Sequence, residues 1–269
     1  MSRPRTYRTE AIVLRQRPLG EADLLLTLFT PQEGKLRAVA KGVRRFTSKL
    51  AGHLEPLTRV ELSLSVGQGL DVVNQAQMVE GFAAVKGDLA RTSRALYLAE
   101  LVDGFAVERS GNPALYGLLL EALALLGQPP SEGGQPPART GGQEVEPGPL
   151  LRCFEVRLLD LSGFRPELGV CVECRQPPEE GQQRYTPDGG GLLCGECAPP
   201  RARVMSLSSK ALAALRLLDS TSLVQASRLH LAPELVEELR VLLSATIRYW
   251  LEREVRSAAF LETLQARSL

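Results

Sequence analysis

Short runs of apolar residues, separated by glycine and proline turns, fill the first third of the chain. The run at residues 59–64 is the most regular, because Val60, Leu62 and Leu64 alternate with polar or charged residues. A period of two is typical of a strand with one buried face. The five runs of this kind are residues 11–14, 24–29, 36–40, 59–64 and 70–73. They predict a small closed barrel, and the OB-fold is the common five-stranded form.

Beyond Gly81 the apolar residues recur at helical spacing. Helices are expected at residues 89–105, from Pro113, at residues 150–161 and 208–218, and from Pro233. The second of these has almost no polar residue between Leu118 and Leu126, which predicts burial on all sides. Residues 127–148 include six glycines and five prolines, so we expect a surface loop there.

These patterns predict an α+β protein with two domains and one insert. An OB-fold barrel is expected at residues 1–80 and an α-helical domain at residues 81–269, with a cysteine-containing insert at residues 165–202. No apolar stretch approaches the roughly 20 residues of a membrane span. The first ten residues lack the hydrophobic segment of a secretory signal. We therefore expect a cytoplasmic protein without membrane contact.

Four of the five cysteines form two Cys-x-x-Cys pairs. Cys171 and Cys174 are separated from Cys194 and Cys197 by 19 residues, a spacing typical of a four-cysteine zinc site. Each pair can turn tightly enough for both thiolates to reach one ion, and two pairs complete a tetrahedron. Four thiolates leave no open position for substrate, so we expect one structural Zn²⁺. Cys153 falls in the apolar stripe of its helix and is expected in the core.

Positive charge is concentrated in the N-terminal part. Residues 1–80 carry 12 basic and 8 acidic residues, whereas residues 81–200 carry 10 and 16. Residues 34–54 contain no acidic residue, and their cations are Lys35, Arg37, Lys41, Arg44, Arg45 and Lys49. Phe46 lies among them and is placed for base stacking. A run of cations without acidic residues, on a predicted OB barrel, favours nucleic-acid binding over a basic face that is merely solvated.

No combination of residues typical of a catalytic centre is present in the sequence. His53 and His230 lie in unrelated segments, and neither a phosphate-binding glycine loop nor a Gly-x-Ser-x-Gly motif occurs. Glu21 and Asp23 are better interpreted as a turn and a strand start than as an acid pair. We therefore expect no enzyme. A zinc-stabilised OB-fold RNA-binding protein and a zinc-assisted nucleic-acid enzyme remain the alternatives, although the closed cysteine set argues against turnover.

Several short motifs follow one another in a characteristic order. In the N-terminal part they are residues 10–14, 20–23, 28–30, 34–35, 40–42 and Arg45. In the C-terminal part they are Phe154, Leu158, Leu159, residues 163–166, the two cysteine pairs, and Arg256-Ser257 with Phe260-Leu261. In this order the motifs resemble those of the bacterial RecO family of recombination mediators. The last motif is similar to that family's closing Lys-Ser-x-x-Phe-Leu, with Arg in place of Lys, and residues 127–148 are an insertion relative to the pattern.

The resemblance implies a non-enzymatic DNA repair and recombination protein associated with the bacterial nucleoid. Such a protein binds single- and double-stranded DNA, anneals complementary strands coated by single-strand-binding protein, and works with RecR to promote RecA loading. The implied DNA contacts are Lys35, Arg37, Lys41, Arg44, Arg45 and Lys49, with Phe46 as a weaker candidate.

The acidic, apolar C-terminal tail of single-strand-binding protein would need an apolar groove edged by cations. The predicted helical domain offers such an edge where an arginine borders a leucine stripe. The candidates are Arg91, Arg94, Arg152 and Arg157. Arginines that flank a helix are more often simply solvated.

Overall fold

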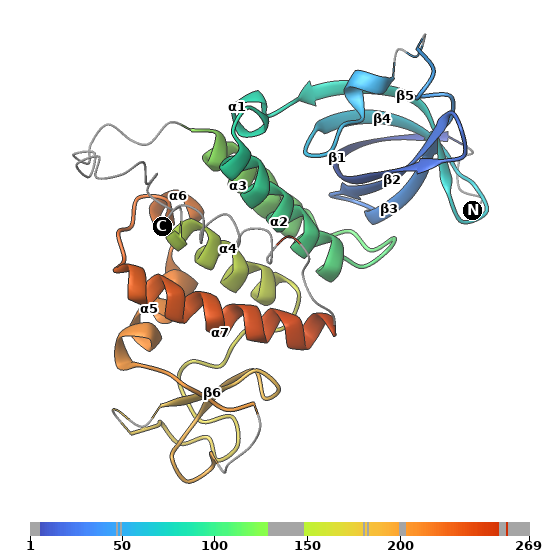
Figure 1. The fold of residues 1–269 in the computed structure, drawn as a ribbon. Helices are drawn as coiled ribbons and strands as arrows, with labels where there is room; N and C mark the ends of the chain where they lie inside the picture. Colours follow the sequence, from blue (N-terminus) through green and yellow to red (C-terminus); the bar gives the residue numbers. More distant parts are fainter. Residues whose placement is uncertain are drawn as a thin grey trace. The chain divides into compact units, whose positions relative to one another are not determined.

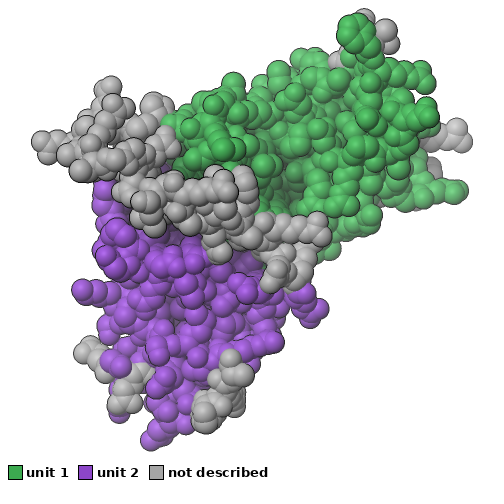
Figure 2. All heavy atoms as spheres, in the orientation of Figure 1, with its two compact units in different colours: residues 1–128, 256–267, 269 green, residues 129–255, 268 purple. Residues whose placement is uncertain are grey.

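The computed structural model describes residues 6–46, 48, 50–128, 148–179, 181, 183–198, 203–252 and 257. The chain separates into two compact units (Figure 2). Unit 1 contains residues 1–128, 256–267 and 269, and unit 2 contains residues 129–255 and 268. Unit 1 therefore holds the predicted barrel, and unit 2 holds all five cysteines. No helix within the described ranges is long and apolar enough to cross a membrane.

Five strands of unit 1 form a closed barrel in the order β1-β2-β3-β5-β4 (Figure 1). The strands are β1 Thr6–Leu19, β2 Asp23–Thr30, β3 Gly34–Ala40, β4 Arg59–Ser65 and β5 Asp71–Glu80. All neighbouring strands are antiparallel except β3 and β5, which pair in parallel. This closed five-stranded barrel is the predicted OB-fold. All five predicted runs are strands, and β1 and β5 extend well beyond them.

Alternate residues of each strand fill the barrel. Val60, Leu62 and Leu64 of β4 are buried, as their period of two predicts, and the charged Glu61 between them is exposed. Leu36, Ala38 and Ala40 of β3 lie in the same core. Because successive side chains of a strand point to opposite faces, the cations that alternate with these β3 residues lie on the outside of the barrel.

In the described part of unit 1, three helices follow the barrel, namely α1 Ala83–Lys86, α2 Leu89–Phe105 and α3 Pro113–Gly127. The side chain of Asp88 caps α2, and that of Asn112 caps α3 directly before Pro113. Such caps satisfy backbone N–H groups that have no partner within the helix. The prediction that α3 is buried on all sides is wrong. Glu121 and Ala124 are exposed, because the leucines of α3 pack on one side only.

The segment after α2 runs beside β3 and ties the helices to the barrel. The amide of Lys35 donates to the carbonyl of Val107 at 3.2 Å, and the amide of Arg109 donates to the carbonyl of Lys35 at 3.1 Å. Arg109 adopts a left-handed φ of 59° and pairs at 2.8 Å with Asp71, whose side chain is fully buried. Through these contacts residues 81–128 belong to the same compact unit as the barrel. The predicted boundary at residue 80 marks the change from strands to helices within this unit.

Two further contacts hold distant parts of unit 1 together. The hydroxyl of Tyr116 on α3 donates to Glu10 on β1 at 2.6 Å. The amide and hydroxyl of Ser257 both donate to the Glu100 carboxylate on α2, at 2.8 and 2.5 Å. The chain therefore returns to unit 1 after completing unit 2.

Unit 2 combines helices with a small sheet (Figure 1). Its helices are α4 Gly148–Leu161, α5 Ser209–Ser220, α6 Leu223–Ala226 and α7 Pro233–Leu251. Its three-stranded sheet, in the order β7-β6-β8, consists of β6 Arg184–Thr186, β7 Gly191–Leu193 and β8 Met205–Ser206. Cys153 is fully buried on α4, as predicted. The predicted loop at residues 127–148 lies for the most part, at residues 129–147, outside the described residues.

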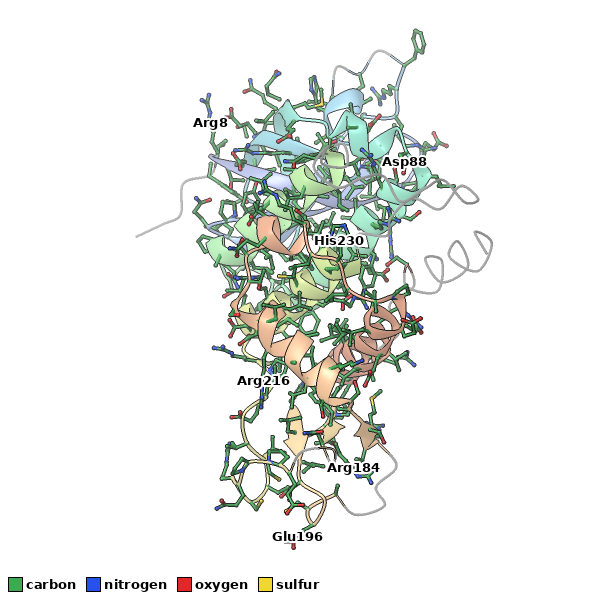
Figure 3. All side chains as sticks on the ribbon, turned by 90° about the vertical axis from the view of Figure 1, so that its left-hand side faces the viewer. Arg8, Asp88, Arg184, Glu196, Arg216 and His230 are labelled. Atoms are coloured by element: carbon green, nitrogen blue, oxygen red, sulfur yellow. The ribbon has the colours of Figure 1, made fainter. Side chains whose placement is uncertain are left out.

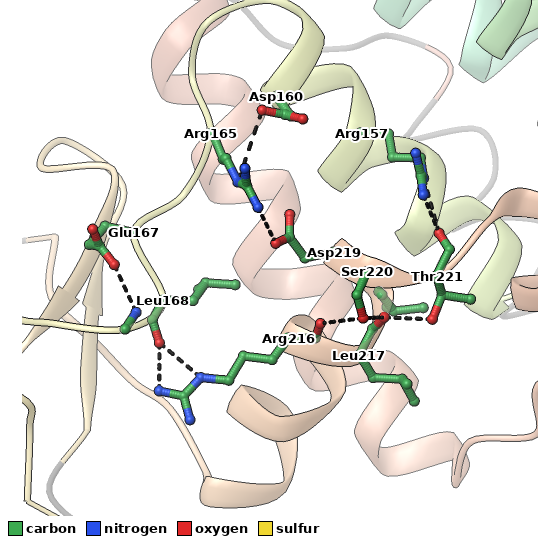
Figure 4. Close-up of polar contacts among 12 residues, drawn as sticks. Arg157, Asp160, Arg165, Glu167, Leu168, Arg216, Leu217, Asp219, Ser220 and Thr221 are labelled. Carbon is green, nitrogen blue, oxygen red and sulfur yellow. Dashed lines mark hydrogen bonds and ion pairs between the residues drawn. The ribbon is translucent and has the colours of Figure 1, made fainter.

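Arginines anchor the segment that leads from α4 to the cysteines (Figure 4). Arg216 of α5 donates two hydrogen bonds to the carbonyl of Leu168, at 2.9 and 2.6 Å. Arg165 pairs with Asp219 of α5 at 2.6 Å. Both ends of residues 165–168 are thus attached to α5, which fixes the entry into the cysteine-containing part.

Candidate metal centre and nucleic-acid interface

The four paired cysteines converge on one point in unit 2. The sulfur atoms of Cys171, Cys174, Cys194 and Cys197 all lie within 4.8 Å of one another. The sulfurs of Cys174 and Cys194 are 3.7 Å apart. A tetrahedron with metal–sulfur bonds of about 2.3 Å has edges of about 3.8 Å, so this distance fits two ligands of one ion. The donor set and its spacing therefore fit a tetrahedral four-thiolate metal site.

Tight turns and the small sheet position the two pairs. The amide of Cys171 donates to the carbonyl of Gln176, and the amide of Arg175 donates back to the carbonyl of Cys171. Cys194 directly follows β7, whose first residue is Gly191. A β-carbon on Gly191 would lie 2.7 Å from the carbonyl oxygen of Glu167, so this close approach requires glycine. Strands this short were not predicted, because two or three residues carry no readable period.

The pKa values of the cysteine thiols differ from one another. Burial opposes ionisation of Cys171, but backbone N–H groups of Cys174 and Cys194 lower the pKa of its thiol to about 6. Hydrogen bonds with Cys194 and Cys174 raise the pKa of Cys197 to about 12. Four thiolates at this spacing repel one another. All four cysteines can therefore be ionised together only when a cation is bound between them. Glu196 lies between the second pair in sequence, yet it is exposed at the tip of this part of unit 2 (Figure 3).

On unit 1 the predicted cations fall into two groups. Lys35 and Arg37 lie on the outer face of β3, and both meet carboxylates. The Lys35 ammonium donates to the backbone carbonyl of Asp103 at 2.5 Å and lies 3.6 Å from its carboxylate. Arg37 pairs with Glu108 at 2.9 Å, and both side chains are about half exposed. Lys35 is only 17% exposed and is therefore the less accessible of the two.

The second group lies in the loop after β3. Lys41, Arg44, Arg45 and Phe46 are all exposed, and Lys49 lies outside the described residues. The loop is anchored to the turn between β1 and β2. The Gly42 amide donates to the Asp23 carboxylate at 2.7 Å, and the Arg44 amide donates to the Ala22 carbonyl at 2.9 Å. Asp23 starts β2, as predicted, and its carboxylate also holds the loop, which was not predicted.

Two more cations, Arg15 and Arg17, lie on the outer face of β1. Arg15 is opposite Thr27 of β2, which is opposite Arg37 of β3, so these three side chains form a row across the sheet. A cavity of about 210 Å³ on this face is lined by Arg15, Arg17, Leu25, Thr27, Lys35, Arg37, Asp103 and Glu108. The apolar run that ends at Leu14 does not predict this extension of β1. The spacing of Arg15 and Arg17, two residues apart, is what a strand with one charged face would show, and it could have predicted that β1 continues past Leu14.

We call the seven cations of this region the basic surface. They are Arg15, Arg17, Lys35, Arg37, Lys41, Arg44 and Arg45. Asp103 and Glu108 pair with Arg15, Lys35 and Arg37. Arg17, Lys41, Arg44 and Arg45 form no ion pair within the described part of the chain. OB-folds hold oligonucleotides on the face of strands 2 and 3 and on the loops between strands 1 and 2 and between strands 4 and 5. Arg37 lies on that face, and the loop after β3 contacts the turn between β1 and β2.

The predicted groove for an acidic tail is not supported at two of its four arginines. Arg152 is buried on α4, 5% exposed, and pairs with the buried Glu155 at 2.8 Å. Arg157 donates two hydrogen bonds to the carbonyl of Thr221, at 3.0 and 2.6 Å (Figure 4). Arg152 is therefore enclosed within unit 2, and the guanidinium of the partly buried Arg157 is engaged by a backbone carbonyl.

Known proteins match nearly the whole chain. Residues 1–82 match the family described as Recombination protein O N terminal, and residues 86–259 match Recombination protein O C terminal. A DNA repair protein RecO of Heliobacterium modesticaldum is 41% identical over an alignment of 266 positions that covers 97% of this chain and 90% of the relative. The RecO protein of a Roseiflexus species is 37% identical over 98% of this chain and 87% of its own, and that of Dehalococcoides mccartyi is 34% identical over both full lengths. The chain therefore belongs to the RecO family and has a role in DNA repair and recombination.

Proposed function

We propose that this protein is a non-enzymatic mediator that binds single- and double-stranded DNA through the basic surface. It anneals complementary strands coated by single-strand-binding protein and, with RecR, promotes RecA loading at the nucleoid. The observation that carries the proposal is the exposed loop of Lys41, Arg44 and Arg45, which is held beside the β1–β2 turn of an OB-fold. Family membership supports the repair role.

Phosphate contacts explain how such a surface acts on strands of any sequence. Guanidinium and ammonium groups bind phosphate oxygens, which every nucleotide presents, so they carry no sequence information. Phe46 is fully exposed next to the cations and offers a face on which a base stacks. A surface with few aromatic residues holds the backbone and leaves most base edges open for pairing with a second strand, as annealing requires.

Zn²⁺ is the metal that we propose for the four cysteines. Zinc favours closed tetrahedral thiolate sites in which the metal has a structural role. When bound, it would supply charge neutralisation and crosslinking of residues 171–197, and no substrate chemistry. Freshly purified protein should contain one equivalent of zinc by elemental analysis. A site filled with iron would contradict this assignment.

Binding of a labelled 30-nucleotide single strand, followed by fluorescence anisotropy over a range of salt concentrations, tests the proposal. Each phosphate contact on single-stranded DNA contributes about 0.7 to the log–log salt slope. The variant Arg44→Ala/Arg45→Ala should therefore flatten the slope by about 1.4. The matched control is Lys210→Ala/Arg228→Ala, which removes two exposed cations of unit 2.

If the two double variants change the salt slope equally, the loop is not the main DNA contact. The same proteins are then compared in an annealing assay with bare strands and with strands coated by single-strand-binding protein, with and without RecR. Equal affinity for structured RNA without any annealing would instead favour an RNA-binding protein. Turnover that depends on a divalent cation would favour an enzyme.

A further inference from the structure

Two carboxylates reach the basic surface from the helical part of unit 1. Asp103, in the last turn of α2, lies 2.8 Å from the guanidinium of Arg15 and 3.6 Å from the ammonium of Lys35. Glu108, in the segment after α2, accepts from two nitrogens of Arg37 at 3.0 and 2.9 Å. A phosphate oxygen would bind these guanidinium groups at similar distances.

The backbone places Glu108 beside β3. Val107 and Arg109, its two neighbours, are hydrogen-bonded to the backbone of Lys35 at 3.2 and 3.1 Å. Arg109 is further held by the buried Asp71. Gly34 allows this close approach, because a β-carbon there would lie 2.0 Å from the carbonyl oxygen of Ser110. The position of Glu108 along β3 is therefore fixed by the backbone, whereas its side chain is held by Arg37 alone in the described contacts and is about half exposed.

The Glu108–Arg37 pair can be displaced. Both side chains are about half exposed, at 53% and 52%. An ion pair in contact with water gains little, since solvent screens its attraction. A DNA strand already held by Arg17, Lys41, Arg44 and Arg45 would bring its next phosphates close to Arg37 at high local concentration. Asp103 is only 14% exposed and makes two contacts, so it is the more firmly placed of the two carboxylates.

We propose that Glu108 competes with DNA phosphate for Arg37 on the outer face of β1, β2 and β3, where Asp103 occupies Arg15 and Lys35 in the same way. DNA binds first to the four unpaired cations and reaches Arg37 only when a phosphate displaces Glu108. The competition lowers affinity for DNA and eases release of the annealed product. This inference rests on the proposed DNA-binding function.

A purely structural role for Glu108 is the alternative. In that case the ion pair only attaches the segment after α2 to β3. Neutralising Glu108 would then change DNA binding no more than the loss of any other negative charge on the barrel. Glu61 provides this comparison, because it is an exposed carboxylate on the outer face of β4, which does not pair with β2 or β3.

The test uses the full chain and the variants Glu108→Gln, Glu61→Gln, Arg37→Ala and Arg37→Ala/Glu108→Gln. Binding of the labelled single strand is measured as a function of salt. Glu108→Gln should raise affinity about 3-fold and steepen the slope by about 0.7. In the wild type the displaced Glu108 takes up a cation that offsets the one released from the phosphate, and in the variant no such carboxylate is freed. The slope should not steepen in the Arg37→Ala background. Thermal unfolding of each variant confirms that it is folded.

The inference is overturned if Glu108→Gln and Glu61→Gln have the same affinity and slope. It is also overturned if Glu108→Gln steepens the slope equally with and without Arg37. The proposed function itself fails in a different way, namely if the wild-type chain binds no DNA or if Arg44→Ala/Arg45→Ala leaves the salt slope unchanged.

Discussion

The buried carboxylate of Asp71 should make Arg109 a major contributor to the stability of unit 1. Asp71 is fully buried and accepts from Arg109 at 2.8 Å, from the Tyr7 hydroxyl at 2.5 Å and from the Gly67 amide at 3.2 Å. Removing one partner of a buried ion pair costs about 3–5 kcal/mol. Arg109 is one third exposed and two other donors remain, so Arg109→Ala should cost about 2–3 kcal/mol.

Urea unfolding of the full chain, followed by circular dichroism, measures this change. The single tryptophan, Trp250, lies in unit 2, so its fluorescence transition should move little. Removing the negative charge of Asp71 as well, in Arg109→Ala/Asp71→Asn, should restore part of the lost unfolding free energy. A neutral amide costs less to bury than an unpaired carboxylate. A double variant less stable than Arg109→Ala would refute the reasoning. Arg37→Ala, which breaks an exposed pair, is the control and should cost less than about 1 kcal/mol.

The pH dependence of this effect has a definite sign. Burial works against ionisation of Asp71, but hydrogen bonds from Arg109 and Tyr7 leave its pKa below the ordinary value. A depressed carboxyl pKa stabilises the fold above the unfolded value of about 3.9, and this stabilisation is lost as pH falls through the folded pKa. In Arg109→Ala the burial remains without the cation. The difference in stability between wild type and variant should therefore be full near pH 7 and shrink as pH falls from the pKa of Asp71 in the variant to its lower pKa in the wild type.

Three further outcomes are expected. Cys171→Ser should lose the bound metal, measured by elemental analysis, and lower the midpoint of the Trp250 transition, while DNA affinity per folded molecule stays near wild type. Phe46→Ala should weaken single-strand binding by about 1–3 kcal/mol with an unchanged salt slope, because stacking releases no counterions. A slope change equal to that of a lost cation would contradict stacking. An isolated fragment of residues 1–80 should be less stable than one of residues 1–128 by thermal unfolding, because it lacks Arg109 and Tyr116.

Local sequence patterns predicted the elements of the fold well, but they could not predict partners that are distant in sequence. The period of two in β4 and the two cysteine pairs depend on neighbouring residues, and both proved informative. Lys35 and Arg37 looked like free cations because the residues around them contain no acid. Their partners, Asp103 and Glu108, lie about 70 residues later and come close only through the packing of α2 on the barrel. Arg152 was interpreted as an arginine at the edge of a groove for a different reason. Its partner Glu155 is only three residues away, but the sequence does not show that both side chains are buried.

The contact between Ser257 and Glu100 has a consequence for how the protein folds during synthesis. Ser257 is separated from Glu100 by 157 positions, and all of unit 2 except residue 268 lies between residue 128 and residue 256. A ribosome synthesises the chain from its N-terminus onward at about 5–20 residues per second, and domains generally fold as they emerge. The segment that completes unit 1 therefore emerges after unit 2. We expect a released chain truncated after residue 255 to contain a folded unit 2 and a unit 1 that is more sensitive to protease than in the full chain.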